Sequence, residues 1–157
     1  MAVDEWLSHN CKLVIITTIE AGQIAEKYIK STGIDATILP PLRQTQLYPY
    51  YNAADIFVVP SRKESIGLVY AEALISGTPV VGYHQSIEEL RRELGVYIGE
   101  GFNTMDEGPQ ALAEKIKKVL RTKIDRQDLH KAVVEKLSWE VKFQEYDQLY
   151  RKLINNS

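Results

Sequence analysis

Two kinds of hydrophobic pattern alternate along the first hundred residues. Short apolar, β-branched runs predict strands at residues 12–17, 36–39, 55–59, 78–82 and 96–98. Because these runs are continuously apolar, they are typical of parallel strands that are covered on both faces. Helical periodicity between them predicts helices near residues 20–31, 44–53, 67–76 and 87–94. Strands that alternate with helices predict right-handed βαβ crossovers and an α/β fold with a three-layer, Rossmann-like parallel sheet of about five strands.

The pattern changes near residue 100, where only helices follow. Helical periodicity predicts C-terminal helices at about residues 109–122, 126–137 and 139–154. The last of these carries large apolar side chains at alternating spacings of four and three: Trp139, Phe143, Tyr146, Tyr150 and Leu153. We expect this aromatic stripe to pack on the domain's own surface. The alternative is that it docks on another domain or subunit.

Composition narrows the class of protein. A chain of 157 residues with 45% hydrophobic and 25% charged residues is long enough for one globular domain, residues 1–157, with its own core. The net charge of −2 gives no general attraction to nucleic acid. A single cysteine excludes an internal disulfide framework and favours a reducing, cytoplasmic location. No apolar run approaches the roughly 20 residues of a membrane-spanning helix.

Positive charge is concentrated in one segment, although the net charge of the whole chain is slightly negative. Six cationic residues fall within a short stretch of the C-terminal region: Lys115, Lys117, Lys118, Arg121, Lys123 and Arg126. We interpret the cluster as a solvated helix face. Peripheral contact with a membrane surface is the alternative interpretation.

The start of the helix predicted at residues 67–76 has the properties of an anion site. In doubly wound sheets, ligands bind at the carboxyl ends of the strands, and this helix follows the third predicted strand. The backbone N–H groups of Gly67, Leu68 and Val69 belong to the first turn, where they lack helical partners. Such donors and the helix dipole favour phosphate, and Gly67 has no side chain to keep a ligand away from the backbone.

Two carboxylates flank this helix start. Glu72 is the only charged residue between positions 66 and 75, and Glu64 lies in the preceding loop. Both carboxylates would repel a bound diphosphate unless each also accepts hydrogen bonds from hydroxyl groups of the same ligand. Each such hydrogen bond contributes about 1.5–3 kcal/mol, because the acceptor is charged. A diphosphate with a polyol at each end, as in a nucleotide-sugar, meets that requirement. The alternative is that the two acids occur at this spacing by chance, although a buried unpaired carboxylate is costly.

Three segments carry a resemblance to a known family. The segments YNAADIFVVPS (51–61), ESIGLVYAEA (64–73) and SGTPVV (76–81) resemble the C-terminal, donor-binding domain of retaining glycosyltransferases of family 4, the group 1 enzymes with the GT-B fold. The signature of this family is two glutamates separated by seven residues, which Glu64 and Glu72 match. The similarity extends over nearly the whole chain from Lys12 onward.

The resemblance implies a set of roles. Glu64 would contact the donor sugar as the catalytic residue, and Glu72 would bind the ribose hydroxyls. The loop that contains Pro41 and Leu42 would lie along the base. The donor-binding residues implied by position are Glu64, Ser65, Ile66, Gly67, Leu68, Val69 and Glu72. The resemblance implies no metal and no other cofactor, because cationic side chains and helix dipoles neutralise the leaving diphosphate.

The chain also departs from the family pattern. Ser65 stands where the family usually has Gly, and Ile66 stands where it has Phe. The acceptor domain is absent from these residues, and so is the first strand of the donor domain with the Arg and Lys that grip the diphosphate. If the neighbouring strands close the resulting gap, the strand order becomes 2-1-3-4-5; otherwise another chain fills it. Arg62, Lys63 and Arg43 are either ordinary surface charges or substitutes for the missing cations.

The sequence therefore predicts the nucleotide-sugar-binding half of a retaining glycosyltransferase that transfers a hexose-type sugar to an acceptor. Alone it would be inactive, since it would need an N-terminal acceptor domain or a partner subunit. The alternatives are a split-enzyme subunit, and a non-catalytic module that associates with a partner or with itself through the aromatic stripe. A nucleotide-sugar epimerase is a third candidate. A dinucleotide-dependent oxidoreductase is disfavoured, because Gly99 and Gly101 are followed by Thr104 where a third glycine is needed.

Overall fold

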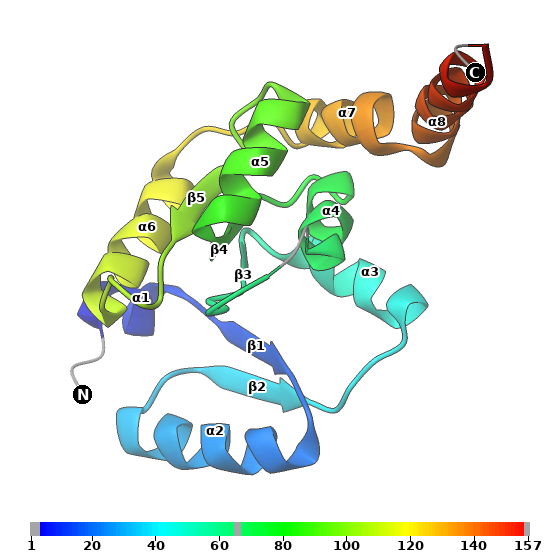
Figure 1. Ribbon diagram of the computed structural model, residues 1–157. Helices are drawn as coiled ribbons and strands as arrows, with labels where there is room; N and C mark the ends of the chain where they lie inside the picture. The colour runs from blue at the N-terminus through cyan, green and yellow to red at the C-terminus, as the bar shows by residue number, and fades with distance from the viewer. Residues whose placement is uncertain (1–3, 65–66, 156–157) are drawn as a thin grey trace.

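The computed structural model describes residues 4–64 and 67–155 of the chain (Figure 1). Strands and helices alternate in the first two thirds, and helices follow. The strands are β1 (Leu13–Ile16), β2 (Ala36–Leu39), β3 (Phe57–Val58), β4 (Val80–Tyr83) and β5 (Gly99–Phe102). The helices are α1 (Glu5–Asn10), α2 (Ile19–Thr32), α3 (Gln44–Ala53), α4 (Leu68–Ile75), α5 (His84–Leu94), α6 (Pro109–Arg121), α7 (Arg126–Leu137) and α8 (Trp139–Asn155).

The three-layer arrangement is present around β3, β4 and β5, which form a parallel sheet in that order. Adjacent residues of β4 belong to different cores. Val80 packs with Ile98 in a core that α4, α5 and α7 cover, whereas Val81 packs with Phe102 in a second core against α6. Both faces of β4 are covered, which explains why the sequence is continuously apolar at this strand.

The single sheet with the order 2-1-3-4-5, expected if the neighbouring strands closed the gap, is not formed by the described residues. β1 pairs with β2 in parallel, with Leu13 opposite Ala36 and Ile16 opposite Leu39, but within the described residues this pair is a separate two-stranded sheet. Figure 1 shows it below the three-stranded sheet, with α2 on its outer face. The gap between β1 and β3 has therefore not closed.

Contacts at both ends of the β1–β2 unit attach it to the rest of the domain. Before β1, α1 is attached to α6: Lys117 contacts Asp4 at 2.9 Å, and the guanidinium of Arg121 lies 5.5 Å from the Trp6 ring centroid. After β2, α3 packs against α4.

Two predicted element boundaries are shifted. The fifth strand lies at residues 99–102 rather than 96–98, and α5 begins at His84 rather than near residue 87. Ile98 is fully buried although it is outside the ladder, and its carbonyl accepts the N–H of Val80 at 2.9 Å. An apolar run thus marks a buried segment, whereas pairing depends on register with β4.

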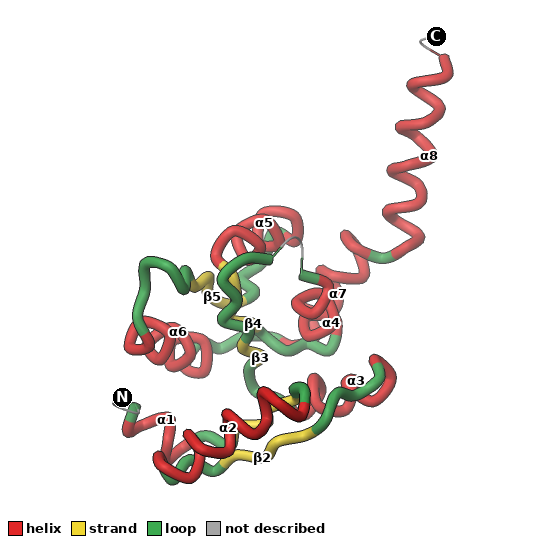
Figure 2. The backbone as a smooth tube through the Cα atoms, turned by 60° about the horizontal axis from the view of Figure 1, so that its bottom comes forward, coloured by secondary structure: helices red, strands yellow, loops and turns green. Residues whose placement is uncertain are grey.

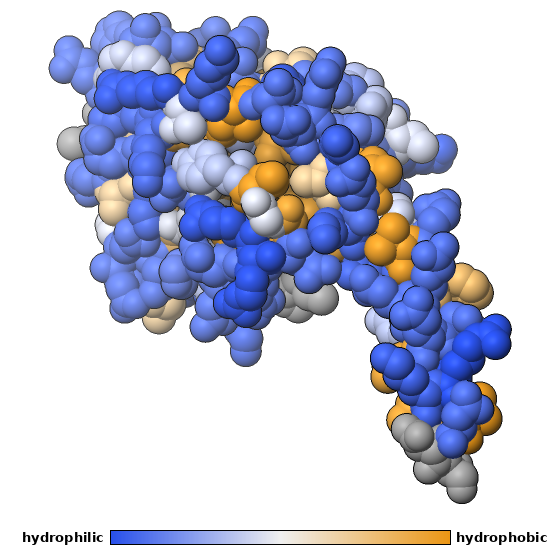
Figure 3. All heavy atoms as spheres, turned by 90° about the horizontal axis from the view of Figure 1, so that it is seen from above, coloured by the Kyte–Doolittle hydropathy of each residue, from blue (hydrophilic) through white to orange (hydrophobic). Residues whose placement is uncertain are grey.

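α8 contradicts the expectation that its aromatic stripe packs on the domain. Figure 2 shows it projecting from the body, and Figure 3 shows apolar side chains along it. The exposed fractions of Trp139, Phe143, Tyr146, Tyr150 and Leu153 are 84%, 71%, 58%, 63% and 58%. The extended backbone of Ser138 (ψ 153°) turns the chain away after α7, whose own apolar face is already used in the core. The side chains of the stripe are therefore largely exposed to solvent instead of buried against the domain.

Three of the six residues in the cationic cluster form ion pairs with described residues of the domain. Lys115 pairs with Glu107 at 2.7 Å and Lys118 pairs with Glu100 at 2.8 Å, in addition to the pair between Lys117 and Asp4. Lys118, Arg121 and Lys123 are exposed, whereas Lys115, Lys117 and Arg126 are half-buried, so the interpretation as a solvated face holds for only part of the cluster. None of the described helices is both long enough and apolar enough to cross a membrane.

Candidate functional site

The predicted anion site at the start of α4 is open to solvent. Gly67 is the N-cap in a left-handed conformation (φ 64°, ψ 75°), and Leu68, the first helical residue, is 77% exposed. No acceptor within the described residues meets the N–H groups of Gly67, Leu68 and Val69. The predicted ligand contacts of Ser65 and Ile66 fall outside the described residues.

A buried tyrosine fixes the position of this helix start. Tyr70 is fully buried, and its ring lies between two glycines. A Cβ atom on Gly67 would lie 2.5 Å from the ring, and one on Gly82 would lie 2.4 Å from it. The absence of side chains at both positions therefore allows the ring to enter between α4 and β4.

The hydroxyl of Tyr70 is inserted into the ladder between β3 and β4. The N–H of Val59 donates to the carbonyl of Val81 at 2.9 Å, so the next bond of a parallel ladder would join the Tyr83 N–H to the Val59 carbonyl. Instead, the Tyr83 N–H donates to the Tyr70 hydroxyl at 2.9 Å, which donates to the Val59 carbonyl at 3.5 Å. The carboxyl ends of β3 and β4 are thereby separated by one oxygen atom and tied to α4.

Glu64 lies at the same end of the sheet. Its Oε1 accepts the Ser61 hydroxyl at 2.8 Å, and the hydroxyl of Thr104, from the loop after β5, donates to the Ser61 carbonyl at 3.0 Å. Burial raises the pKa of Tyr70; the hydrogen bond from Tyr83 opposes that change, and the negative charge of Glu64 adds to it. The Glu64 carboxylate is therefore close enough to the buried Tyr70 hydroxyl to influence its pKa.

Glu72 occupies the second turn of α4, as predicted, and faces α3. Its Oε1 accepts the Gln44 amide N–H at 2.7 Å, and its Oε2 accepts the Tyr51 hydroxyl at 3.2 Å. Among the described residues, no cation lies within salt-bridge distance of this half-buried carboxylate. Burial, followed by the charge of Glu72, raises the pKa of Tyr51 to about 12, so the phenol remains a donor at neutral pH.

A pocket of about 250 Å³ adjoins the Glu72 carboxylate. It lies between α3 and α4 and is lined by Gln44, Thr45, Tyr48, Tyr51, Glu72 and Ile75. The loop with Pro41 and Leu42, predicted to lie along a base, connects β2 to α3 and ends next to Gln44. Chain connectivity therefore brings this loop close to Glu72.

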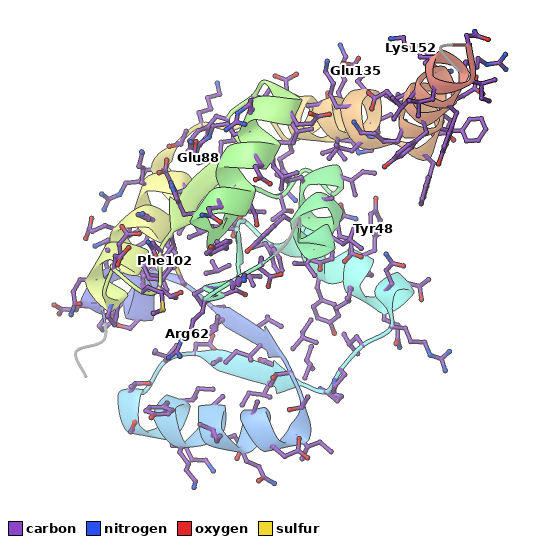
Figure 4. The ribbon with its side chains drawn as sticks, in the orientation of Figure 1. Tyr48, Arg62, Glu88, Phe102, Glu135 and Lys152 are labelled. Carbon is purple, nitrogen blue, oxygen red and sulfur yellow. The ribbon has the colours of Figure 1, made fainter. Side chains whose placement is uncertain are left out.

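The three candidate cations are exposed. Arg43 is the exposed N-cap residue of α3, and Arg62 and Lys63 are exposed in the loop after β3. In Figure 4, Arg62 extends from this loop toward the β1–β2 pair. Their substitution for the family's missing cations remains a prediction.

Sequence reasoning missed Gln44, Tyr51 and Tyr70. Gln44 and Tyr51 lie 28 and 21 residues before their partner Glu72 and on another helix, so no local spacing connects them. The only signal was that Tyr51 opens the first of the three resembling segments. Tyr70 had a signal of a different kind, since its ring needs glycine at positions 67 and 82.

Comparison with known proteins gives a consistent result. The family profile described as "Glycosyl transferases group 1" matches residues 2–136. A D-inositol 3-phosphate glycosyltransferase of Xylanimonas cellulosilytica is 55% identical over 83 residues, which are 49% of this chain and 20% of that protein. A glycogen synthase of Chlorobium phaeobacteroides is 35% identical over 105 residues, 64% of this chain and 22% of that protein. The chain thus spans about a fifth of the length of these relatives.

Solved structures share the fold at low sequence identity. AviGT4, a glycosyltransferase involved in avilamycin A biosynthesis, matches 96% of this chain with a TM-score of 0.67 and 18% identity, over 46% of its own length. Sucrose-phosphate synthase from Thermosynechococcus elongatus matches 93% with a TM-score of 0.68 and 23% identity, over 39% of its length. The pneumococcal O-GlcNAc transferase GtfA, solved with UDP and GlcNAc, matches 94% with a TM-score of 0.60 and 15% identity, over 37% of its length.

Proposed function

Because this chain belongs to the group 1 glycosyltransferases, we propose that it is the nucleotide-sugar-binding domain of a retaining glycosyltransferase. In the proposed reaction, a hexose-type sugar passes from a nucleoside diphosphate to an acceptor with its anomeric configuration retained. The observation that carries this proposal is the geometry around α4. An open helix start, with one carboxylate in the loop before it and one in its second turn, lies at the carboxyl end of a parallel sheet.

The donor site is proposed to bind the three parts of its ligand separately. The N–H groups of Gly67, Leu68 and Val69, with the positive end of the α4 dipole, receive the diphosphate. Glu72 accepts hydrogen bonds from the ribose hydroxyls, while the loop that contains Pro41 and Leu42 lies along the base. Support comes from the Glu72 carboxylate, which is half-buried, adjoins a pocket and is held by neutral donors.

The proposed chemistry is stabilisation of a leaving group. When the bond between the anomeric carbon and the diphosphate breaks, negative charge accumulates on the diphosphate, and preorganised N–H donors stabilise it without reorganisation. Glu64 contacts the departing sugar from the opposite side of the helix start. We expect no metal in this role.

The chain is proposed to supply one wall of the cleft only. The relatives are about five times longer than the matched region, and the aromatic stripe of α8 is exposed. An acceptor-binding domain or a partner subunit would cover this stripe and complete the cleft. Alone, the domain would bind the donor weakly and transfer nothing, since water would not be excluded. The same exposed stripe also supports the alternative, a non-catalytic module that only binds a partner.

Binding measurements separate these two functions. Ligand-observed NMR with UDP-, GDP- and ADP-sugars should detect binding of at least one donor by the wild-type chain. Glu72→Ala should weaken that binding about tenfold, because each lost charge-assisted hydrogen bond contributes about 1.5–3 kcal/mol before water replaces it. Equal affinities of the wild type and the variant would contradict the role of Glu72. Absence of any nucleotide binding, with retained association through α8, would favour the interaction module.

A further inference from the structure

Glu72 is held in one orientation by two donors from α3. Gln44 contacts one carboxylate oxygen at 2.7 Å, and Tyr51 contacts the other at 3.2 Å. A carboxylate offers about four lone-pair sites, so two remain for a ligand. Both donors are neutral, and the negative charge that strengthens a bond from a sugar hydroxyl is therefore not cancelled.

Tyr51 is itself fixed before any ligand arrives. Its exposed fraction is 7%, and its ring meets Phe57 edge-on with 5.1 Å between the centroids. Its backbone carbonyl accepts the Thr78 hydroxyl at 2.5 Å. Because folding has already immobilised this phenol, orienting Glu72 adds little entropic cost when a ligand binds.

We propose that Tyr51 and Gln44 are positioning residues, which orient the Glu72 carboxylate and make the site select ribonucleotides over 2′,3′-dideoxyribonucleotides. This inference rests on the proposed function, since it concerns the same donor site. Tyr51 is the stronger of the two, because it is buried whereas Gln44 is exposed. Neither residue is required for binding of the diphosphate, which is assigned to the start of α4.

The test compares ligands that differ only in the hydroxyls. UDP, GDP and ADP, their 2′,3′-dideoxy counterparts and inorganic diphosphate are titrated into the wild type, Tyr51→Phe and Gln44→Ala. Tyr50→Phe is the matched control, because Tyr50 lies on the same helix and does not contact Glu72. Affinities are measured by ligand-observed NMR, and a ¹H–¹⁵N spectrum of each variant checks its fold.

The wild type should prefer the ribonucleotide by about tenfold, the loss expected when a charged acceptor forgoes hydroxyl donors. Tyr51→Phe should reduce this preference about fivefold, and Gln44→Ala should reduce it less. Inorganic diphosphate should bind all proteins equally, and Tyr50→Phe should retain the full preference. A purely structural role of Tyr51 would instead weaken the binding of all three ligand classes together.

The unfavourable outcomes are distinguishable. If Tyr51→Phe retains the preference of the wild type, the inference is overturned while the proposed function stands. If Tyr51→Phe does not fold, an unchanged preference in Gln44→Ala overturns the inference. If the wild type binds no nucleotide at all, the proposed function fails and the inference fails with it.

Discussion

Two halves of the molecule differ in how completely their apolar side chains are covered. Around β3, β4 and β5, residues such as Leu74 and Val80 are fully buried, with helices on both faces of the sheet. In the β1–β2 unit, Leu13 is 44% exposed and Ile24 of α2 is 59% exposed. The residues assigned to the donor diphosphate, sugar and ribose all lie in the covered half. Their geometry therefore depends on contacts within that half, whereas the uncovered surfaces are where we expect further protein to bind.

Truncating one leucine in each half, Leu74 in the closed core and Leu13 in the more exposed unit, tests this contrast most strongly. Leu74→Ala in α4 should lower the free energy of unfolding by about 3 kcal/mol, because it leaves a cavity in a closed core. Leu13→Ala in β1 should cost less than about 1 kcal/mol, because that side chain is already partly in water. Urea denaturation measures both values. Equal losses would mean that the two halves are equally well packed.

The next effect concerns the attachment of α7 to the C-terminal end of α3. Arg126 donates to the carbonyls of Ala54 at 2.9 Å and Asn52 at 2.8 Å, and to the Thr78 hydroxyl at 2.9 Å. Arg126→Ala should cost about 2 kcal/mol, because several charge-assisted bonds are lost together.

The control for Arg126 is Arg121→Ala, which removes only the exposed contact with Trp6 and should cost below about 1 kcal/mol. Thermal unfolding of both variants gives the comparison. A smaller loss for Arg126→Ala than for Arg121→Ala would show that α3 is held by other contacts.

Tyr70→Phe tests the inserted hydroxyl and should lower the stability less than the two most destabilising substitutions above. The ring and its packing remain, so stability should fall by about 1 kcal/mol, the contribution of the bond to the Tyr83 N–H. Tyr28→Phe, on the exposed face of α2, should change stability by about zero. Hydrogen exchange at the Tyr83 amide should accelerate in Tyr70→Phe. Unchanged exchange would indicate that the ladder closes directly onto Val59.

The smallest effect is the pH dependence of the attachment of α8. Lys142 contacts Glu93 of α5 at 2.8 Å and lowers the pKa of Glu93 below its ordinary value of 4.5. Because the folded-state pKa is depressed, the stabilisation is present above the ordinary pKa and is lost as the pH falls through the lowered one.

The stability difference between the wild type and Glu93→Gln should therefore be below about 1 kcal/mol near neutral pH and should vanish once the pH falls below the lowered pKa of Glu93. Glu89→Gln, on the same helix, controls for removal of a charge. A difference that persists in acid would contradict an ionic attachment.

The sequence predicted the features that are local in the chain. Continuous apolar runs identified the covered strands β3 and β4, and helical periodicity gave α3 its observed bounds. The same kind of run at β1 is partly exposed, with Leu13 and Val14 44% and 43% exposed. The position of Glu72 in the second turn of α4 followed from the helix start at Gly67. Each of these depends on spacing within about ten residues, which periodicity captures directly.

The features that depend on distant residues were not predictable. Whether β1 pairs with β3 depends on how the two sheets are placed relative to each other, and whether α8 is covered depends on surfaces that its own periodicity does not describe. The bonds from Gln44 and Tyr51 to Glu72 join separate helices, and the Tyr70 hydroxyl joins a helix to two strands. Such contacts are set by tertiary packing, about which the local sequence pattern holds no information.

The most direct test of the central claim is a titration of the ¹⁵N-labelled chain with UDP-, GDP- and ADP-sugars. We predict that the largest chemical-shift changes caused by the bound donor fall on the amides of Gly67, Leu68 and Val69 and on the Gln44 side chain, and that Glu72→Ala reduces those at Gln44. Changes confined to other surfaces, or none with any donor, would contradict the assignment of the nucleotide-sugar site to the start of α4.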